Sequence, residues 1–577
     1  MRRFTADFET NVNEKDCRVW AWAVCEIGNV DTFTYGNDIE TFINWCMNKK
    51  YNYKIWFHNL KFDGEYIFSY LLKNGYTYIE NKKERRDKTF TCLISSMGQF
   101  YSIEIFFTVK KTKVNKVTIY DSLKLLNMSV DTIAKQFDLP IRKLEIDYKE
   151  FREIGHELTT EEVDYIRNDV EIMARALNIM FDLGLTKMTI GSCALHNYKT
   201  MVRNFNDYYP LLPIELDTDI RKSYKGGFTY LNPIYKDKEV KNGIVLDVNS
   251  LYPSVMKNAY LPFGKPLYFS GKYKKSFLYP LYIQRITCRF ELKEGKIPTI
   301  QLKNNPSYNP TEYLSSSNGE IIDLTLTNID LELFLENYNI YDEYYDGGWE
   351  FKQTRGLFNN YIDIWSNNKI NAKKEGNKAL YMVSKLMLNS LYGKFAKNPH
   401  NRGKYPFINE NGEVSYHLGA LEEGKGLYIP IGAFITSYAR EKTIRTSQAI
   451  RDYTLNKYNK DYYIYSDTDS IHMLELPEEE LKSFVDIDDY ILGYWKLESK
   501  FKRGKFIRQK CYIEEDLEGK INVTVAGLPK RLGKYVNFEN FKTGFTLLAS
   551  DETIDHKLTY KHVNGGVMLV DTDFTIK

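Results

Sequence analysis

Apolar residues in the first 185 positions fall into short strand-like runs and one longer run with a helical period. The segments CRVWAWAV, YKIWFHNL and KVTIYDSL are rich in the β-branched and aromatic residues that favour strands. The segment EEVDYIRNDVEIMARALNIMF has the length and the apolar spacing of a helix. Strands that alternate with a helix predict an α/β domain over residues 1–189.

A second α/β region begins near residue 225, with the apolar strand NGIVLDV. A long polar and aromatic segment, 261–356, separates this strand from a basic helical segment, 357–397. In YPFINENGEVSYHL, Asn411-Gly412 lies between alternating runs and predicts a β-hairpin. The segment YYIYSDTDSIHML predicts two strands joined by a tight turn, and a β-rich tail follows.

Composition narrows the class of protein. A chain of 577 residues divides into several domains, and 79 Lys+Arg against 76 Asp+Glu excludes a uniformly cationic packaging protein. The seven scattered cysteines predict neither a disulfide framework nor a cysteine-rich zinc site, which fits a reducing cytoplasm. We expect a soluble protein without a membrane span or a secretory signal. The 46 tyrosines have two explanations, AT-rich coding or aromatic side chains that stack on nucleic-acid bases.

Three acidic segments in the N-terminal domain suggest a metal site. Asp7 and Glu9 are two residues apart in a predicted strand, so both side chains leave the same face. Asp63 follows in HNLKFDGEYI, and Asp169 shares a helix face with Tyr165 at a spacing of four. Taken singly, each acid has the simpler interpretation of a solvated charge. Together, the acids could bind two divalent cations that activate water against a phosphodiester.

A second set of acids lies in the C-terminal half. Asp-Thr-Asp occurs at 217, 467 and 571, but only Asp467–Asp469 lies between two apolar runs that predict a hairpin tip. Asp247 ends the strand GIVL before a helix, which places it at the carboxyl edge of a sheet. Its alternative role is an ordinary helix cap. Asp247 and Asp469 could bind two Mg²⁺ ions for in-line displacement at phosphorus.

A basic helix face lies between these acids. In SKLMLNSLYGKF, Lys385, Asn389 and Tyr392 are spaced four and three apart, and Lys378 extends the same face toward the helix start. A cation there could neutralise a departing pyrophosphate. The alternative is a solvated helix surface.

These motifs together resemble those of family B DNA polymerases. The matching segments are DVNSLYP, KLMLNSLYG and YSDTDS, with Tyr224-Lys225-Gly226-Gly227, Thr436, Ala439-Arg440 and Lys510-Cys511-Tyr512. The early acidic segments resemble the three exonuclease motifs of proofreading polymerases. Together with the chain's small size, the set most closely resembles the protein-primed DNA polymerases of small tailed bacteriophages, the φ29 type.

The resemblance implies a ribonuclease-H-like 3′–5′ exonuclease domain joined to a right-hand polymerase with palm, fingers and thumb. The implied ranges are 1–189 exonuclease, 190–260 and 428–542 palm, 261–356 first insertion, 357–397 fingers, 398–427 second insertion and 543–577 thumb. The first insertion would contact a terminal protein, and the second would close a ring around the template.

The resemblance also assigns roles to residues. Metal ligands would be Asp7, Glu9, Asp63, Asp169, Asp247, Val248 and Asp469. Asp467 would support catalysis, and Tyr165 would orient the attacking water. The incoming nucleotide would contact Tyr252, as a gate against the ribose 2′-hydroxyl, together with Lys385, Tyr392 and Lys378. DNA would contact Thr10, His58, Asn59, Phe62, Ser122, Leu123, Tyr224, Gly226, Gly227, Thr436, Arg440, Arg508, Lys510 and Tyr512. For Phe62, a place in the core is an equal alternative.

Implied cofactors are two Mg²⁺ ions per active site, which Mn²⁺ can replace. Implied partners are template and primer DNA, dNTPs, a terminal protein and a single-stranded-DNA-binding protein, for a monomer in the host cytoplasm. Two other functions remain open: a polymerase that uses only ordinary primers, and a catalytically silent DNA-binding subunit. Tyr381 departs from the family pattern, because a second phosphate-binding lysine is expected there, and Lys378 or Lys373 could replace it.

The basic segment KFKRGKFIRQK, residues 500–510, contains six cations and two phenylalanines but no acid. It predicts a phosphate track for primer or duplex, or, alternatively, a solvated loop.

Overall fold

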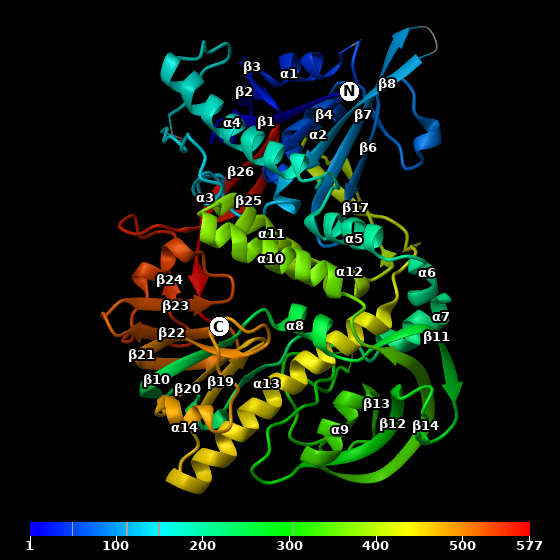
Figure 1. Cartoon of the computed structure of the whole chain (residues 1–577). Coiled ribbons are helices and arrows are strands. Elements are labelled where there is room, and N and C mark those ends of the chain that lie inside the picture. Colours follow the sequence, from blue (N-terminus) through cyan, green and yellow to red (C-terminus); the bar gives the residue numbers. More distant parts are fainter. Residues whose placement is uncertain (49, 111–112, 148–149, 304) are drawn as a thin grey trace.

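A computed structural model describes residues 1–577 except 49, 111–112, 148–149 and 304. The N-terminal region is an eight-stranded mixed sheet in the order β3-β2-β1-β4-β8-β7-β6-β5 (Figure 1). Its strands are β1 (Arg2–Thr10), β2 (Val19–Glu26), β3 (Asn29–Gly36), β4 (Tyr53–Phe57), β5 (Thr77–Tyr78), β6 (Thr89–Ile94), β7 (Phe100–Lys110) and β8 (Lys113–Asp121). The predicted α/β fold is therefore present.

Four helices accompany this sheet: α1 (Ile39–Cys46), α2 (Leu60–Lys73), α3 (Val130–Gln136) and α4 (Thr160–Asp182). Helix α4 begins with a capping box, in which the Thr159 side chain accepts from Glu162 N–H and the Glu162 side chain accepts from Thr159 N–H. Because this cap fixes the start of α4, the helix carries Asp169 across β1 and β2 in a defined register.

The second sheet has seven strands in the order β23-β22-β21-β10-β20-β19-β9. They are β9 (Thr229–Leu231), β10 (Glu239–Val248), β19 (Tyr463–Asp467), β20 (Ser470–Leu474), β21 (Trp495–Arg508), β22 (Cys511–Asp516) and β23 (Ile521–Val525). Strand β10 pairs with β20 so that Asp247 lies opposite Ser470, directly beside the Asp467–Asp469 turn. The predicted strand pair is confirmed at this point.

Long helices connect and cover the two sheets. Helix α13 (Ile429–Tyr458) runs diagonally along the seven-stranded sheet, while α10 and α11 lie between the two sheets (Figure 1). The other helices are α5 (Ile190–Met201), α6 (Phe205–Tyr208), α7 (Ile214–Arg221), α8 (Leu251–Asn258), α10 (Asn359–Glu375), α11 (Lys378–Ser390), α12 (Tyr392–Phe395) and α14 (Glu478–Lys482). The basic helical segment predicted over residues 357–397 contains α10, α11 and α12, and Leu391 separates α11 from α12.

The segment 261–356 forms its own four-stranded sheet, in the order β11-β14-β12-β13, with helix α9 beside it. Its elements are β11 (Leu261–Phe269), β12 (Leu281–Leu292), β13 (Ile322–Thr327), α9 (Asn328–Asn337) and β14 (Tyr338–Thr354). A separate apolar cluster fills this unit, which explains how a polar insertion folds as a compact body.

Short hairpins complete the chain. The hairpin predicted at Asn411-Gly412 is confirmed as β16 (Lys404–Ile408) and β17 (Val414–Leu418). The tail contributes β24 (Thr546–Leu547), β25 (Lys557–Val563), β26 (Gly566–Thr572) and β27 (Phe574–Thr575), and β15 (His400–Asn401) pairs with β18 (Glu422–Glu423). Val414, Val563 and Val567 are buried in the core of the N-terminal region, so both hairpins dock on that region. Among the described residues, no helix is long and apolar enough to cross a bilayer.

Candidate active sites

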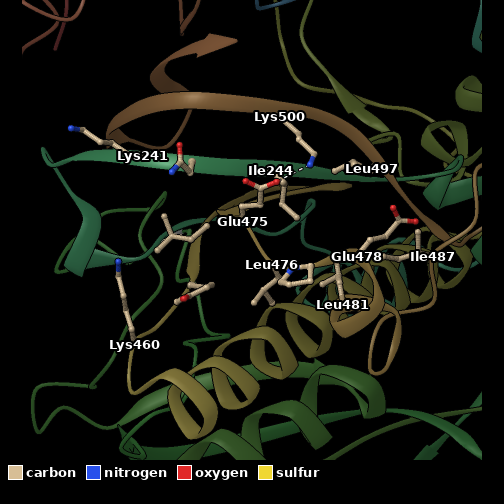
Figure 2. Close-up of a pocket in the computed structure, with 14 residues that line it drawn as sticks. Lys241, Ile244, Lys460, Glu475, Leu476, Glu478, Leu481, Ile487, Leu497 and Lys500 are labelled. Carbon is tan, nitrogen blue, oxygen red and sulfur yellow. Dashed lines mark hydrogen bonds and ion pairs between the residues drawn. The ribbon is translucent and has the colours of Figure 1, made fainter. Parts of the chain in front are cut away.

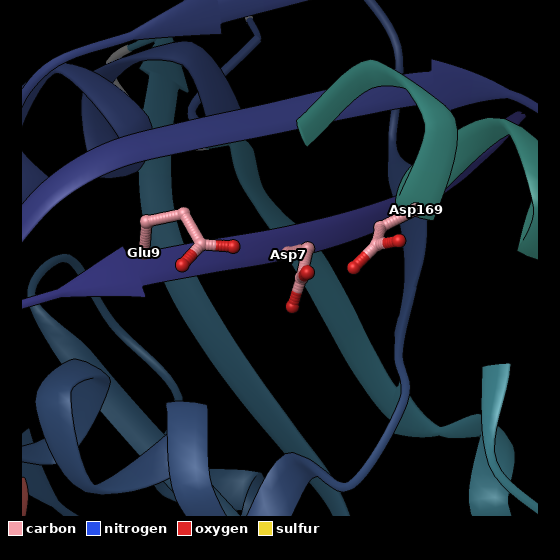
Figure 3. Close-up of side chains that lie close together, drawn as sticks. All are labelled: Asp7, Glu9 and Asp169. Carbon is pink, nitrogen blue, oxygen red and sulfur yellow. The ribbon is translucent and has the colours of Figure 1, made fainter. Parts of the chain in front are cut away.

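Asp7, Glu9 and Asp169 converge at the centre of the N-terminal sheet. Strand β1 presents Asp7 and Glu9 on one face, and α4 brings Asp169 to them, so that one carboxylate oxygen from each lies within 4.8 Å of the others (Figure 3). The sequence analysis had already included Asp169 in the predicted metal-binding set, and the fold brings it to the pair on β1. Asp63 lies on α2 outside this group of three.

The electrostatics of this centre fit a bound cation. Burial, then the charge of Asp169, raises the pKa of Asp7 to about 7, whereas Lys143 lowers it. Burial and the neighbouring Asp7 raise the pKa of Asp63 well above its ordinary value. One oxygen each of Asp63 and Asp169 is buried without a hydrogen bond. Buried, mutually repelling carboxylate oxygens are the donor set that a hard divalent cation stabilises.

Lys143 is a residue of this centre that the sequence argument missed. Its ammonium pairs with Asp169 and lies 5.3 Å from the centroid of the Tyr165 ring. Tyr165 is buried in an apolar cluster one turn before Asp169 on α4. A lone lysine in a loop carries no spacing signal, which explains why only the fold identifies it. The water-orienting role of Tyr165 remains a prediction.

The residues expected to bind a 3′ end lie around the start of α2. Asn59 adopts a left-handed backbone, with φ of 76°, and Phe62 is half-buried against the N-terminal core. Leu123 is half-exposed nearby in the chain segment after β8, and Thr10 ends β1. These positions are compatible with contact to DNA.

Two members of that expected set have internal partners. Ser122 is 1% exposed, and its hydroxyl lies 2.9 Å from the Phe57 carbonyl and 3.0 Å from His58 Nδ1. The other ring nitrogen of His58 is 2.7 Å from the Met128 carbonyl. The Ser122 and His58 side chains therefore join the chain around Phe57 to the segment that contains Ser122 and Met128. Direct DNA contact through these two side chains remains a prediction.

The second acidic centre lies at the edge of the seven-stranded sheet. Asp247 ends β10, and Asp467 and Asp469 flank the turn at Thr468, whose φ is 61°. Val248 N–H donates to the Asp469 carbonyl at 2.8 Å, which ties the two segments together. The N-cap position of α8 is Ser250, whose side chain makes no capping hydrogen bond, so Asp247 is not the N-cap residue that the alternative role required. The carbonyl of Val248 as a metal ligand remains a prediction.

Charges around this centre are mixed. Burial, then Glu498 and Asp469, raises the pKa of Asp247 to about 7, and Lys496, with its Nζ 3.7 Å from Asp247 Oδ1, lowers it. Lys510 Nζ lies 3.4 Å from Asp467 Oδ2. Lys496 and Glu498 were not predicted, because they are alternating residues of an ordinary strand. Their proximity arises from the pairing of β21 with β10.

The predicted nucleotide-binding residues lie on adjoining helices. Tyr252 on α8 stacks on Tyr392 of α12, with ring centroids 4.0 Å apart and planes 20° from parallel. Lys385 and Asn389 are exposed on α11. Lys378, by contrast, forms an ion pair with Asp138 at 3.2 Å, with both side chains 59% exposed. Its predicted nucleotide contact would require it to leave Asp138.

Another lysine completes the basic face. Burial, then the charges of Lys385, Lys496 and Lys373, lowers the pKa of Lys369 on α10. Lys369 Nζ also lies 5.9 Å from the ring centroid of Tyr381, the position that lacks the expected lysine. Helix α10 therefore supplies cations next to the site where the family pattern is broken. Sequence reasoning named Lys373 but missed Lys369.

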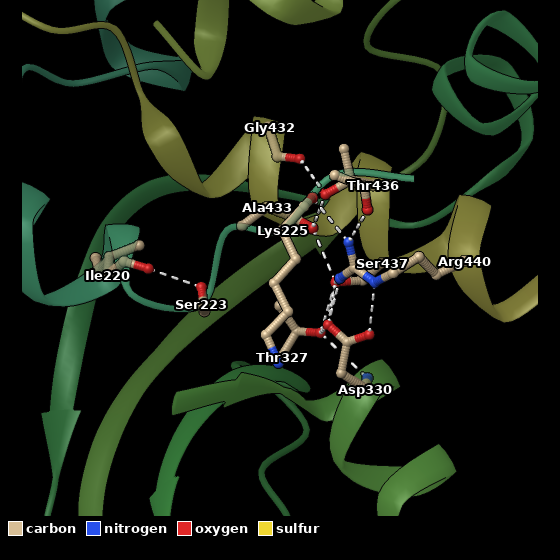
Figure 4. Close-up of polar contacts among 11 residues, drawn as sticks. Ile220, Ser223, Lys225, Thr327, Asp330, Gly432, Ala433, Thr436, Ser437 and Arg440 are labelled. Atoms are coloured by element: carbon tan, nitrogen blue, oxygen red, sulfur yellow. Dashed lines mark hydrogen bonds and ion pairs between the residues drawn. The ribbon is translucent and has the colours of Figure 1, made fainter. Parts of the chain in front are cut away.

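Arg440 organises the Tyr224–Gly227 loop rather than facing solvent. It is 2% exposed, and one guanidinium nitrogen donates to the Lys225 and Gly226 carbonyls at 2.8 Å each (Figure 4). Its Nη2 lies 2.5 Å from Asp330 Oδ2 on α9. Burial makes this pairing obligatory, because an unpaired buried guanidinium would be strongly destabilising. Arg440 therefore positions the loop, and its contact with DNA remains a prediction.

Thr436 also has internal partners, and its predicted contact with DNA remains a prediction. It is 1% exposed, and its hydroxyl lies 3.1 Å from the Gly432 and Ala433 carbonyls of its own helix. In the loop itself, a Cβ at Gly227 would lie 2.5 Å from Thr468 Oγ1. Glycine is therefore required at 227 for the loop to pack against the catalytic turn. Tyr224 and Gly226 are half-exposed and remain predicted DNA contacts.

The basic segment 500–510 is strand β21 and its following turn, not a loop. Lys500 pairs with Glu475 at 2.7 Å and Arg503 with Glu515 at 2.5 Å. Arg508 Nε donates to the Lys577 carbonyl at 2.7 Å. A continuous phosphate track is thus partly neutralised by internal partners. Lys510, at the turn, is exposed close to Asp467 and keeps its predicted role.

Tyr512 joins an aromatic group behind Lys510. Its ring stacks on Phe506 at 5.3 Å and lies 5.4 Å from Tyr465, whose hydroxyl accepts from Lys510 N–H at 3.0 Å. A separate cavity of about 480 Å³, lined by Ile244, Leu474 and Lys500 among others, lies between the seven-stranded sheet and α14 (Figure 2). Of the predicted phosphate track it includes Lys500, but none of the predicted carboxylate or nucleotide-binding residues lines it.

Comparisons with known proteins agree with this arrangement. A sequence model of DNA polymerase type B, organellar and viral, matches residues 45–485. The DNA polymerase of Bacillus phage M2 is 44% identical, with full coverage of both chains, and that of Bacillus phage phi29 is 43% identical over all of this chain and 99% of the relative. That of Streptococcus phage Cp-1 is 32% identical over all of this chain and 98% of the relative.

Solved structures give the same result. A structure of Phi29 DNA polymerase complexed with primer-template DNA and incoming nucleotide substrates has a TM-score of 0.91 at 42% identity, with full coverage of both chains. The expected exonuclease domain with a palm, fingers and thumb is confirmed, and the enzyme is a DNA polymerase. The chain therefore belongs to the family B DNA polymerases, in the organellar and viral group that includes the φ29-type phage enzymes.

Proposed function

We propose that this DNA polymerase extends a 3′-hydroxyl at the Asp247, Asp467 and Asp469 centre and proofreads at the Asp7, Glu9, Asp63 and Asp169 centre. The observation that carries the proposal is the presence of two separate carboxylate centres in one chain, built by different sheets. The copied strand, the primer and the dNTPs would be the substrates, as they are in the phi29 ternary complex.

Each centre would hold two Mg²⁺ ions, which Mn²⁺ could replace. The unpartnered buried oxygens of Asp63 and Asp169 support such a site in the exonuclease. Asp247, Asp469 and the Val248 carbonyl would be the ligands in the palm. When bound, the ions lower the pKa of the attacking oxygen and stabilise the charge that develops at phosphorus.

The protein's own groups would orient the reactants. Tyr252, held by its stack on Tyr392, would exclude a ribose 2′-hydroxyl from the nucleotide site. Lys385, with Lys369 and Lys373 behind it, would balance the triphosphate charge. Lys510 would hold the primer end. In the exonuclease, Tyr165 would orient water, and Asn59 and Phe62 would hold an unpaired 3′ end.

The two insertions support protein-primed initiation and strand displacement. Residues 261–356 form a separate compact unit that would contact a terminal protein, which supplies the first hydroxyl. The second insertion would close a ring, because the tip of its hairpin at Gly412 meets the thumb turn: a Cβ there would lie 3.1 Å from Asn564 Nδ2. Tyr416 of this hairpin also lies 6.4 Å from His562 of the thumb, between ring centroids. A closed ring supports processivity.

The proposed ranges are 1–189 for the exonuclease, 190–260 and 428–542 for the palm, 357–397 for the fingers and 543–577 for the thumb. The insertions are 261–356 and 398–427. We propose that the enzyme acts as a monomer in the cytoplasm of a phage host, with a single-stranded-DNA-binding protein as a further partner.

The test is primer extension on a singly primed circle, with and without a candidate terminal protein. Products far longer than the circle would support strand displacement. Label transferred to the terminal protein would support protein priming, while extension of the ordinary primer alone would favour a polymerase that uses only such primers. Absence of extension in both arms would contradict the proposed reaction.

A further inference from the structure

The thumb hairpin formed by β25 and β26 is fixed against the exonuclease domain. Tyr66 Oη on α2 donates to the Val567 carbonyl at 2.6 Å, and Val563 and Val567 are buried in the exonuclease core. A Cβ at Gly565 would lie 2.1 Å from the Cys17 carbonyl oxygen, so the turn touches the exonuclease backbone directly. These contacts fix the position of the whole hairpin relative to α2.

Tyr560 of this hairpin lies over the start of α2. Asn59 Nδ2 donates to Tyr560 Oη at 3.0 Å, and the ring centroid of Tyr560 is 6.2 Å from that of Phe62. Lys61 Nζ lies 5.0 Å from the Tyr560 ring centroid. The thumb therefore contacts the same side chains that the proposed function assigns to the unpaired 3′ end.

The hydrogen bond matters because it occupies one of the two N–H donors of the Asn59 amide. Burial raises the pKa of Tyr560, so its phenol stays protonated and neutral, although the hydrogen bond from Asn59 opposes this shift. A neutral phenol accepts one hydrogen bond of ordinary strength. A DNA oxygen that accepts from this same N–H must first replace the tyrosine hydroxyl.

We propose that Tyr560 caps the single-strand pocket of the exonuclease, holding the Asn59 amide until an unpaired 3′ end displaces it. The cap thereby weakens binding of a 3′ end, which raises the KM for a single-stranded substrate. This inference rests on the proposed exonuclease function and deepens it, since it makes a thumb residue a determinant of substrate entry.

The neighbouring residue Lys561 supplies a matched control. Successive strand residues point to opposite faces, and Lys561 Nζ pairs with the exposed Glu14 at 2.8 Å. Changing Lys561 thus removes a contact between the same hairpin and the same domain without touching Asn59. An exposed ion pair of this kind contributes little to stability.

The decisive variant is Tyr560→Phe, which keeps the ring and removes only the hydroxyl. Steady-state degradation of a single-stranded oligonucleotide by the full-length enzyme should show a KM lower by about two- to tenfold, the worth of one hydrogen bond, with kcat unchanged. Lys561→Met should change neither parameter. Primer extension by Tyr560→Phe reports that the chain is folded.

A double-mutant cycle separates the cap from a general effect on the hairpin. In an Asn59→Ala background, Tyr560→Phe should no longer lower KM, because the shared hydrogen bond is already absent. An unchanged or raised KM in the single variant, or an equal decrease in both backgrounds, would overturn the cap. If the wild-type enzyme degrades no single strand, the proposed exonuclease function fails instead.

Discussion

The two carboxylate centres solve the same chemical problem in opposite environments. In the exonuclease, Glu9 and Asp169 are buried, and oxygens from three acids lie within 4.8 Å of one another. In the palm, Asp247, Asp467 and Asp469 are half-exposed at a sheet edge, and lysines lie near Asp247 and Asp467. Under the proposed function, the buried centre would accept only a chain end, whereas the more open centre would accept a duplex and a nucleotide together.

The two centres also differ in how positively charged side chains are distributed among their acids. The exonuclease concentrates negative charge around one lysine, Lys143, whereas the palm distributes Lys496 and Lys510 among its acids. Removing a single cation should therefore disturb the buried centre more than the open one, because low dielectric strengthens each interaction. The predictions below test this contrast from the largest expected effect to the smallest.

Asp469→Asn should reduce nucleotide addition by at least about a hundredfold, because it removes a group that stabilises developing charge at the reaction centre. Degradation of single strands should persist. The control is Asp571→Asn, which changes the same Asp-Thr-Asp tripeptide at an exposed position on the thumb. Primer-extension rates of the two variants give the comparison, and equal losses would contradict the assignment of the turn.

Lys143→Met should reduce exonuclease activity by about 10- to 100-fold, the usual effect of losing a partner that orients a metal ligand. It leaves Asp169 buried without its ion pair. Primer extension should be unchanged. If exonuclease activity stayed at the wild-type level, the buried centre would not depend on its one lysine.

Tyr252→Val should narrow the discrimination between dNTP and rNTP by about 10- to 100-fold, because it removes the ring that would meet a 2′-hydroxyl. Tyr252→Phe keeps that ring against Tyr392 and should preserve discrimination. The ratio of kcat/KM values for the two nucleotides is the measurement. Preserved discrimination in the valine variant would rule out the gate.

Lys378→Met should change the KM for dNTP by less than about threefold, since its ammonium lies 3.2 Å from Asp138 and a contact with the nucleotide would require it to leave that carboxylate. Lys385→Met should raise that KM by about tenfold through loss of a charge-assisted contact. A larger effect at Lys378 would show that it leaves Asp138 to bind the triphosphate.

Sequence patterns predicted the parts of the fold that have local signals. Asp7 and Glu9 lie two residues apart on one strand, and Asn411-Gly412 marks a hairpin. Asp247 lies at the end of an apolar strand. All three elements are present in the structure. Lys143, Lys369 and Lys496 had no such signal. Their importance comes from strand order and helix packing, which bring distant segments together.

Four predicted DNA contacts have internal hydrogen-bond partners, which teaches a related lesson. Arg440, Thr436, His58 and Ser122 belong to motifs that suggest contact with DNA, yet their side chains hydrogen-bond inside the protein. A motif identifies a segment but does not say which of its side chains face outward. Burial, which depends on the complete fold, decides between direct contact and positioning.

The central claim is that the two acidic centres act independently. It is tested most directly by measuring primer extension and single-strand degradation in two purified variants, Asp7→Ala/Glu9→Ala and Asp247→Asn/Asp469→Asn. The account predicts that the first variant extends primers but does not degrade, and that the second degrades but does not extend. Loss of both activities in either variant, while it remains folded by thermal melting, would contradict it.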